Sequence, residues 1–217
     1  MEKYLILIMG PQGSGKGTQG KKLAEKLKFI YAEMGPTLKE YARQSTDDRD
    51  IINKYMKQGV LVPDEIVIKA IKYKFGGGVS IILDGVPRKQ GQAEEIVRLA
   101  NEYGFKIIAI YIDLDDSEAT KRLLARLVCP VDGFEPHYPE SLKKTKCDKC
   151  GAKLIKRDDD TEKVIKKRLE EYHNKTEPMM KYLKEQGVKI IKIDGQPKVE
   201  TVESNIINQL EKTGIKL

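Results

Sequence analysis

Residues 10–19 read Gly-Pro-Gln-Gly-Ser-Gly-Lys-Gly-Thr-Gln, and this stretch decides the fold. It follows a continuous apolar run at residues 4–9 and opens a helical pattern at residues 16–27. A glycine-rich loop in this context turns its backbone N–H groups toward a phosphate, and the helix N-terminus adds a positive dipole. The sequence therefore predicts a phosphate-binding loop formed by Gly13, Ser14, Gly15, Lys16, Gly17 and Thr18.

Side chains at and near this loop carry its expected chemistry. Lys16 would neutralise the β- and γ-phosphates of a nucleoside triphosphate. The common pattern has Ser or Thr directly after the lysine, whereas Gly17 intervenes here and Thr18 carries the hydroxyl. Asp84 ends a second apolar run, residues 80–83, at the sheet edge where a Mg²⁺ ion bridging two phosphates would lie. Thr18 and Asp84 are therefore the predicted magnesium ligands, although an acid at a strand end is also a common helix cap.

Alternating strand and helix patterns extend along the whole chain. Further apolar runs lie at residues 29–32, 107–112 and 189–193, and helical patterns lie at residues 63–75, 90–103, 117–127, 161–186 and 199–213. Continuous apolar runs are typical of buried parallel strands. The alternation predicts an α/β fold with a doubly wound parallel five-stranded sheet of the P-loop NTPase type. Two stretches, residues 35–62 and 129–156, interrupt it and are expected to project over the sheet edge as lobes.

The composition limits the compartment and the partners. Hydrophobic residues make up 40% of the 217 residues and charged residues 34%, which fits a soluble globular protein. The apolar run at residues 4–9 is too short to span a bilayer or to form a signal-peptide core, so the cytosol is expected, without membrane association. The net charge of +7 could indicate a nucleic-acid partner, but acidic residues are interleaved with the lysines. Phosphate-rich small substrates explain the charge equally well.

The three cysteines lie in the second interrupting stretch. Residues 129–133 read Cys-Pro-Val-Asp-Gly and residues 147–151 read Cys-Asp-Lys-Cys-Gly, a spacing typical of two zinc knuckles. The predicted ligands are Cys129, Asp132, Cys147 and Cys150, with His137 as the rival fourth ligand. Three free cysteines without a metal are the remaining alternative. A metal here would be structural, because so small a lobe cannot bury enough apolar surface to hold itself together.

Several separate motifs resemble the adenylate kinase family. Residues 10–19 and the sequence Asp-Gly-Val-Pro-Arg at residues 84–88 carry the resemblance. Residues 59–65, 122–126 and 157–160 extend it in the order that the family has, and Arg168 follows Arg157 by eleven residues. The resemblance implies reversible phosphoryl transfer from ATP-Mg to AMP, giving two ADP, with Mg²⁺ and a structural Zn²⁺ as cofactors. It also implies a monomer, although nothing in the sequence excludes self-association.

The resemblance divides residues 1–217, a single nucleoside-monophosphate (NMP) kinase domain, into three parts. These are a core at residues 1–33, 63–127 and 158–217, a mobile NMP-binding lobe at residues 34–62 and a mobile zinc-type lid at residues 128–157. Closure of both lobes would exclude water and prevent hydrolysis of ATP.

Positive side chains are implied at the point where two nucleotides bring their phosphates together, because phosphoryl transfer depends on charge stabilisation. Arg88 would hold the NMP phosphate, and Arg122 would lie over the ATP base. Since Arg122 and Arg126 are four residues apart, one helix face is expected to carry both. Leu123, Leu124 and Leu127 would then pack onto the sheet. The implied catalytic residues are Lys16, Arg88, Arg126, Arg157 and Arg168.

The resemblance also implies residues that contact each nucleotide. On the ATP side, His137 would lie near the ribose, and Gln196 is a further contact. On the NMP side, Gln92 would read the base and Gly85 would permit its close approach. The implied NMP-binding residues are Met34, Gly35, Lys39, Val60, Val62, Gly85, Arg88 and Gln92.

The NMP lobe departs from the family pattern at two positions. Met34 replaces a threonine near the AMP base, and Lys39 replaces an arginine that contacts the AMP phosphate. Lysine keeps the charge but loses the bidentate fork. A flexible thioether can accept several bases, so we expect AMP to remain a substrate with relaxed base discrimination. The alternative is that neighbouring backbone groups restore selectivity.

Two rival functions remain at the level of sequence. One is a UMP/CMP-type or broad-specificity NMP kinase, although the short-lid members of that group lack a long metal-binding insertion. The other is a basic nucleotide- or RNA-binding module that uses its zinc knuckle. Against the second rival, Phe and Tyr do not cluster with the basic residues, so no stacking platform for bases is evident.

Overall fold

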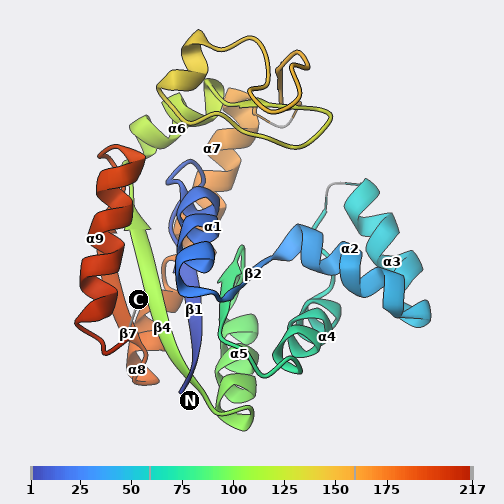
Figure 1. The fold of residues 1–217 in the computed structure, drawn as a ribbon. Helices are drawn as coiled ribbons and strands as arrows, with labels where there is room; N and C mark the ends of the chain where they lie inside the picture. The colour runs from blue at the N-terminus through green and yellow to red at the C-terminus, as the bar shows by residue number, and fades with distance from the viewer. Residues whose placement is uncertain (1, 59, 159, 216–217) are drawn as a thin grey trace.

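The computed structural model describes residues 2–58, 60–158 and 160–215 and contains the expected parallel five-stranded sheet. Its strand order is β2-β3-β1-β4-β7 (Figure 1). The bounds are β1 (Lys3–Met9), β2 (Ile30–Glu33), β3 (Ile81–Asp84), β4 (Phe105–Asp113) and β7 (Lys189–Asp194). The chain order reverses beside β1, which places the phosphate loop at the point where ligands of such sheets bind.

Helices cover both faces of the sheet because the strands are apolar on both sides. Ile6 and Ile8 of β1 pack beneath α1 (Lys16–Leu27) and α9 (Val199–Glu211). Leu5, Leu7 and Met9 point to the opposite face, toward α4 (Asp64–Phe75), α5 (Gln90–Glu102) and α8 (Met179–Glu185). The alternation of side chains along the central strand therefore builds two cores.

The first interrupting stretch is helical, and its first helix begins at Met34, one residue before the interruption at residues 35–62. It contains α2 (Met34–Gln44) and α3 (Thr46–Lys57), which project sideways from the end of β2 (Figure 1). Ser45 separates the two helices, and its hydroxyl accepts from the N–H of Asp48 at 3.3 Å, which caps α3. Ile52 is fully buried and anchors α3.

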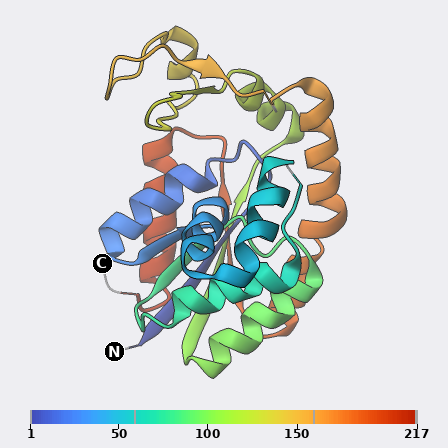
Figure 2. The same cartoon turned by 90° about the vertical axis from the view of Figure 1, so that its right-hand side faces the viewer.

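The lid lies above the carboxyl ends of the strands in both views (Figures 1 and 2). Its base is an antiparallel pair, β5 (Leu127–Val128) with β6 (Ile155–Lys156). Between these strands the lid contains one 3-10 turn, η1 (Glu140–Lys143), and an isolated antiparallel bridge between Lys146 and Lys153.

The predicted helix at residues 117–127 is wrong at its end, because α6 (Asp116–Leu124) stops earlier. The N–H of Arg126 bonds to the carbonyl of Leu123 at 3.1 Å, which tightens the last turn, and Leu127 then enters β5. Arg126 therefore lies beyond the helix, not on one helix face with Arg122. The leucines also pack differently from the expectation: Leu123 contacts α7, and Leu127 joins the core of the lid.

The predicted single helix at residues 161–186 is interrupted. It consists of α7 (Glu162–Glu171), a π-helical turn η2 (Tyr172–Thr176) and α8. Pro178 has no N–H to continue the α-helical ladder, and the N–H of Glu177 bonds five residues back to Tyr172 at 3.0 Å. Across the described ranges, no helix combines the length and apolar character that a membrane crossing requires.

Candidate active site and metal centre

The phosphate loop has the backbone geometry that its glycines predict. Gly10 and Gly13 have φ angles of 141° and 84°. A Cβ atom at Gly10 would lie 2.3 Å from the carbonyl oxygen of Ile112, and one at Gly13 would lie 2.9 Å from that of Ala119. No other residue fits this approach between the loop and its neighbours.

Lys16 begins α1 and turns back over the loop. Its ammonium group donates to the carbonyls of Gly10 and Pro11, both at 2.7 Å. Burial lowers the pKa of Lys16 to about 8, and the negative charge of Asp84 only partly opposes this shift. A bound phosphate would raise the pKa of Lys16 again, so phosphate binding and protonation of Lys16 would favour each other.

The predicted magnesium ligands lie beside this loop. Asp84 is buried at the end of β3, and its Oδ2 accepts from the hydroxyl of Tyr31 at 2.7 Å. Burial is the main cause that raises the pKa of Tyr31, so this hydroxyl stays a donor. Gly17 faces the acid, because a Cβ atom there would lie 3.5 Å from Asp84 Oδ2. Oxygen donors of this kind suit Mg²⁺.

A cleft of about 680 Å³ runs between the phosphate loop and the lid. From the lid, His137 reaches the loop, and its Nδ1 lies 3.5 Å from Oγ1 of Thr18. Gln196 lies close by, where its side-chain amide donates to Asp115 at 3.0 Å. The predicted donor-side residues that line the cleft are Gly13, Ser14, Gly15, Lys16, Gly17, Thr18, Asp84, Arg122, Arg126, His137 and Arg157.

Two of the predicted catalytic arginines contact the buried carboxylate of Asp160. Arg126 donates to both oxygens of Asp160, at 2.7 and 2.6 Å, and Nη1 of Arg168 lies 3.7 Å from the same acid. The Asp160 side chain is 2% exposed, so its carboxylate is shielded from solvent and faces these two cations. Nη1 of Arg157 lies 3.6 Å from Glu135 of the lid. Asp160 thus has a positioning role that the sequence reasoning, which treated it only as part of a motif, did not assign.

The protein holds the guanidinium of Arg122 on three sides. It donates to Glu118 at 2.9 Å and to the carbonyls of Gly195 and Gln196 at 2.9 and 3.0 Å. These bonds fix the plane of the guanidinium at the cleft wall. A fixed plane is the arrangement that stacking on a nucleotide base requires.

On the acceptor side, four predicted residues come together around the end of β3. Gly85 has a φ of 86°, and a Cβ atom there would lie 3.4 Å from Arg88 and 3.7 Å from Met34. The side-chain oxygen of Gln92 accepts from the backbone N–H of Arg88 at 2.7 Å, and its amide donates to Asp64 at 2.7 Å. Gln92 is thus held between α4 and α5, and Asp64 is a residue whose role the sequence reasoning missed.

The remaining acceptor-side residues lie farther out on the NMP lobe and its exit. Gly35 and Lys39 belong to α2, where Lys39 is exposed. Val60 is half exposed, whereas Val62 is buried in the core beneath the lobe. Gly59 and Asp159, which contributed to two of the sequence motifs, lie outside the described residues. Roles for these residues in binding an NMP stay predictions.

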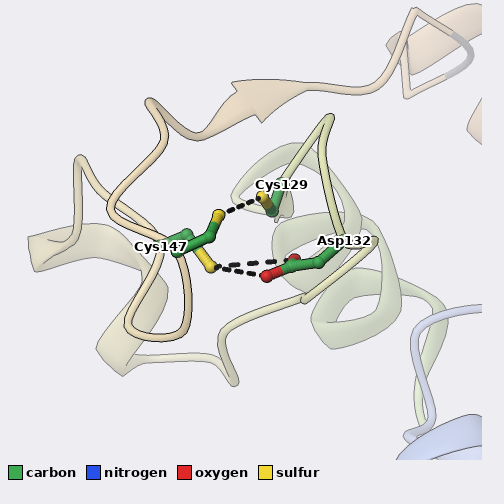
Figure 3. Close-up of side chains that lie close together, drawn as sticks. Cys129, Asp132 and Cys147 are labelled. Carbon is green, nitrogen blue, oxygen red and sulfur yellow. Dashed lines mark hydrogen bonds between the residues drawn. The ribbon is translucent and has the colours of Figure 1, made fainter.

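The lid holds a compact cluster of three cysteines and one carboxylate (Figure 3). The donor atoms of Cys129, Asp132, Cys147 and Cys150 all lie within 4.8 Å of one another. Cys129 Sγ lies 3.4 Å from Cys150 Sγ, and Cys147 Sγ lies 3.3 Å from Asp132 Oδ2. All three cysteines are free thiols. His137 is not part of this cluster.

The two knuckles repeat one backbone geometry. In the first, the N–H of Gly133 bonds to the carbonyl of Cys129 at 3.0 Å, and in the second, the N–H of Gly151 bonds to that of Cys147 at 2.9 Å. The two glycines have φ angles of 71° and 72°. Asp132 therefore occupies the place in the first knuckle that Cys150 has in the second. The N–H of Phe134 donates to Asp132 and lowers its pKa to about 2, so a carboxylate faces the thiols.

The sheet and its loop define a P-loop nucleotide-binding protein. A sequence model described as adenylate kinase matches residues 8–188, and the chain belongs to the adenylate kinase family. Relatives named adenylate kinase come from Petrotoga mobilis, with 37% identity over 94% of this chain and 96% of the relative, and from Streptomyces coelicolor, with 39% identity over 84% and 88%. A third, from Methanococcoides burtonii, has 34% identity over 95% of this chain and 98% of the relative.

Proposed function

We propose that this protein catalyses the reversible transfer of a phosphoryl group from ATP-Mg to AMP, giving two ADP. Membership of the adenylate kinase family and the names of its relatives support this activity. The observation that carries the proposal is the cleft itself, where Lys16, Arg126 and Arg157 line one space from the core and the lid. Convergent cations of this kind stabilise the charge on a phosphoryl group in transfer.

The proposed mechanism gives each group a positional task. The loop N–H groups and Lys16 hold the ATP phosphates, and Thr18 with Asp84 would hold the Mg²⁺ that neutralises them. Arg126, Arg157 and Arg168 contact the group in transfer. Arg88 holds the acceptor phosphate in line with it. The protein contributes alignment and fixed charge, which suffices because the reaction needs little covalent chemistry from the enzyme.

A coupled assay for ADP production from ATP and AMP tests the proposal. Lys16→Ala should abolish turnover, because it removes the charge over the β- and γ-phosphates. Lys26→Ala is the matched control, since Lys26 is exposed on the same helix and should leave turnover unchanged. Binding of ATP without any phosphoryl transfer by the wild type would favour the rival RNA- or nucleotide-binding module.

We further propose that acceptor selectivity is relaxed relative to a strict AMP kinase. Met34 lies beside Gly85, where a threonine would offer a hydroxyl to the base and the methionine offers a flexible thioether. Rates with AMP, CMP, UMP and GMP should differ by less than about tenfold. Met34→Thr should increase the preference for AMP. Strict AMP preference in the wild type would refute this proposal, and a preference for UMP or CMP would identify the rival kinase type.

The lid cluster supports a second part of the proposal, a single structural Zn²⁺ held by Cys129, Asp132, Cys147 and Cys150. Three thiols and a carboxylate within tetrahedral reach are a donor set that zinc accepts, and the paired knuckles present them without rearrangement. The proposed site of action is the cytosol, with the enzyme acting as a monomer. Size-exclusion chromatography with light scattering separates that monomer from a self-associated form.

A further inference from the structure

The side chain of Tyr31, on β2, extends to the carboxyl end of the neighbouring strand β3, where Asp84 lies. It lies on β2 two residues before the strand ends, and it pairs in register with Ile82 of β3. Its side chain runs along the face beneath α1, and its hydroxyl donates to Asp84 Oδ2 at 2.7 Å. Tyr31 therefore contacts the acid that is proposed to bind Mg²⁺.

The packing of α1 leaves space for the Tyr31 ring. A Cβ atom at Gly20 would lie 2.6 Å from ring carbon Cε2 of Tyr31 and 3.1 Å from Cδ1 of Ile8. Only glycine allows the ring to lie there, between the helix and the sheet. The ring packs against Gly20 and the core beneath it, and this packing restricts where its hydroxyl can lie.

The hydroxyl of Tyr31 donates to Oδ2 of Asp84, the oxygen that faces Gly17 of the phosphate loop. A Cβ atom at Gly17 would lie 3.5 Å from Asp84 Oδ2 and 3.6 Å from the Tyr31 hydroxyl, so this pair adjoins the phosphate loop. A carboxylate that binds a metal depends on groups that fix its orientation, and loss of such a group commonly lowers metal affinity 10–100-fold.

We propose that Tyr31 is a positioning residue for magnesium: it holds Asp84 in the orientation that receives the ion of ATP-Mg. Gly20 is its packing partner, and neither Tyr31 nor Gly20 is among the residues that line the cleft. This inference rests on the proposed function, which makes Asp84 a magnesium ligand.

Calorimetric titration with ATP, in the presence and absence of Mg²⁺, tests the inference apart from catalysis. For the wild type, Mg²⁺ should tighten ATP binding. Tyr31→Phe keeps the ring and removes the hydroxyl, and it should reduce the effect of Mg²⁺ about tenfold while leaving the Kd for metal-free ATP unchanged. Tyr41→Phe is the matched control, because Tyr41 donates to another buried carboxylate, Asp48, at 2.9 Å in the NMP lobe.

A second variant and the activity assay separate the outcomes. Gly20→Ala displaces the ring and should cause the same selective loss as Tyr31→Phe. An unchanged Mg²⁺ effect in Tyr31→Phe would overturn the inference, and so would an equal loss of metal-free binding, which indicates a merely structural role. A wild type that binds ATP-Mg but does not convert ATP and AMP to ADP would refute the proposed function instead.

Discussion

At the scale of single residues, the lowered pKa of Lys16 predicts that nucleotide binding depends on pH. Bound phosphates favour the protonated ammonium, whose pKa in the free protein is about 8. Affinity for ATP-Mg should therefore be highest about one pH unit or more below 8 and should fall as pH rises through that value, approaching a tenfold loss per further pH unit. Fluorescence or calorimetric titration between pH 7.5 and 9.5 measures this dependence.

Lys16→Arg is the control for this prediction. A guanidinium remains charged throughout that range, so the Kd of the variant, even if weaker, should not change with pH. A pH dependence that persists in Lys16→Arg would assign it to another group.

The residues predictable from sequence are those that act through local structure. Lys16 and Thr18 belong to one loop, and Asp84 ends an apolar strand, so their positions follow from neighbouring residues. Tyr31 and Asp160 could not be found in this way. Tyr31 contacts Asp84, and Asp160 contacts Arg126. The members of each pair lie far apart in the sequence, and only the folded chain brings them together.

At the scale of elements, the lid knuckles predict a metal-dependent stability. A chelator should lower the Tm of the wild type, because the lid has only a small apolar core besides the cluster. Asp132→Ala should lose the metal and have a low Tm that the chelator no longer changes. Asp132→Cys should retain metal, since it supplies a fourth thiolate at the same knuckle position.

Metal content by mass spectrometry checks this prediction directly, with about one zinc per chain expected for the wild type. Asp148→Ala is the matched control, since Asp148 lies in the second knuckle and pairs with Lys144 outside the cluster. Full metal content in Asp132→Ala would show that the carboxylate is not a ligand.

His173 joins the π-helical turn to the start of α6. One ring nitrogen contacts Glu177 at 2.8 Å and the other contacts Asp116 at 2.9 Å, and these bonds raise the pKa of His173. The stabilisation is fully present below the ordinary pKa of about 6.5 and is lost as pH rises through the higher folded value. Because the ring is half exposed, the effect should be roughly 0.5–1 kcal/mol.

Thermal melts of the wild type and His173→Gln between pH 5.5 and 9 test this contribution. The Tm difference should be about 2 °C at pH 6 and should shrink at pH 9. Lys175→Gln, a substitution in the same turn, should show no such pH dependence. A difference that stays constant with pH would attribute the effect to packing rather than charge.

Element types were more predictable than element ends. Residues 16–27 form a helix with the expected bounds, because a loop and an αL residue, Lys28, delimit it locally. The ends of α6 and α7 depend on contacts that local periodicity does not contain. Leu127 leaves the helical path to pair with Lys156, and Tyr172 begins a π turn against the core.

At the scale of the whole molecule, the lid and the helices α2 and α3 extend from the sheet in different directions (Figures 1 and 2). The lid already lines the donor cleft with His137 and Arg157. The described acceptor-side residues Met34 and Lys39 do not line that cleft. Because phosphoryl transfer needs both phosphates in line and shielded from water, the proposed mechanism predicts that the NMP lobe approaches the lid before reaction.

Small-angle scattering should therefore show a smaller radius of gyration with a bisubstrate analogue, in which two nucleosides share one phosphate chain. ATP-Mg alone should give a smaller change, since it engages the lid without the NMP lobe. Closure should also depend on the acceptor phosphate contact, so Arg88→Ala should keep the response to ATP-Mg and lose the additional compaction. Identical curves for the free and the analogue-bound wild type would show that the arms do not close, and that the reacting phosphates meet without large movements of the lobes.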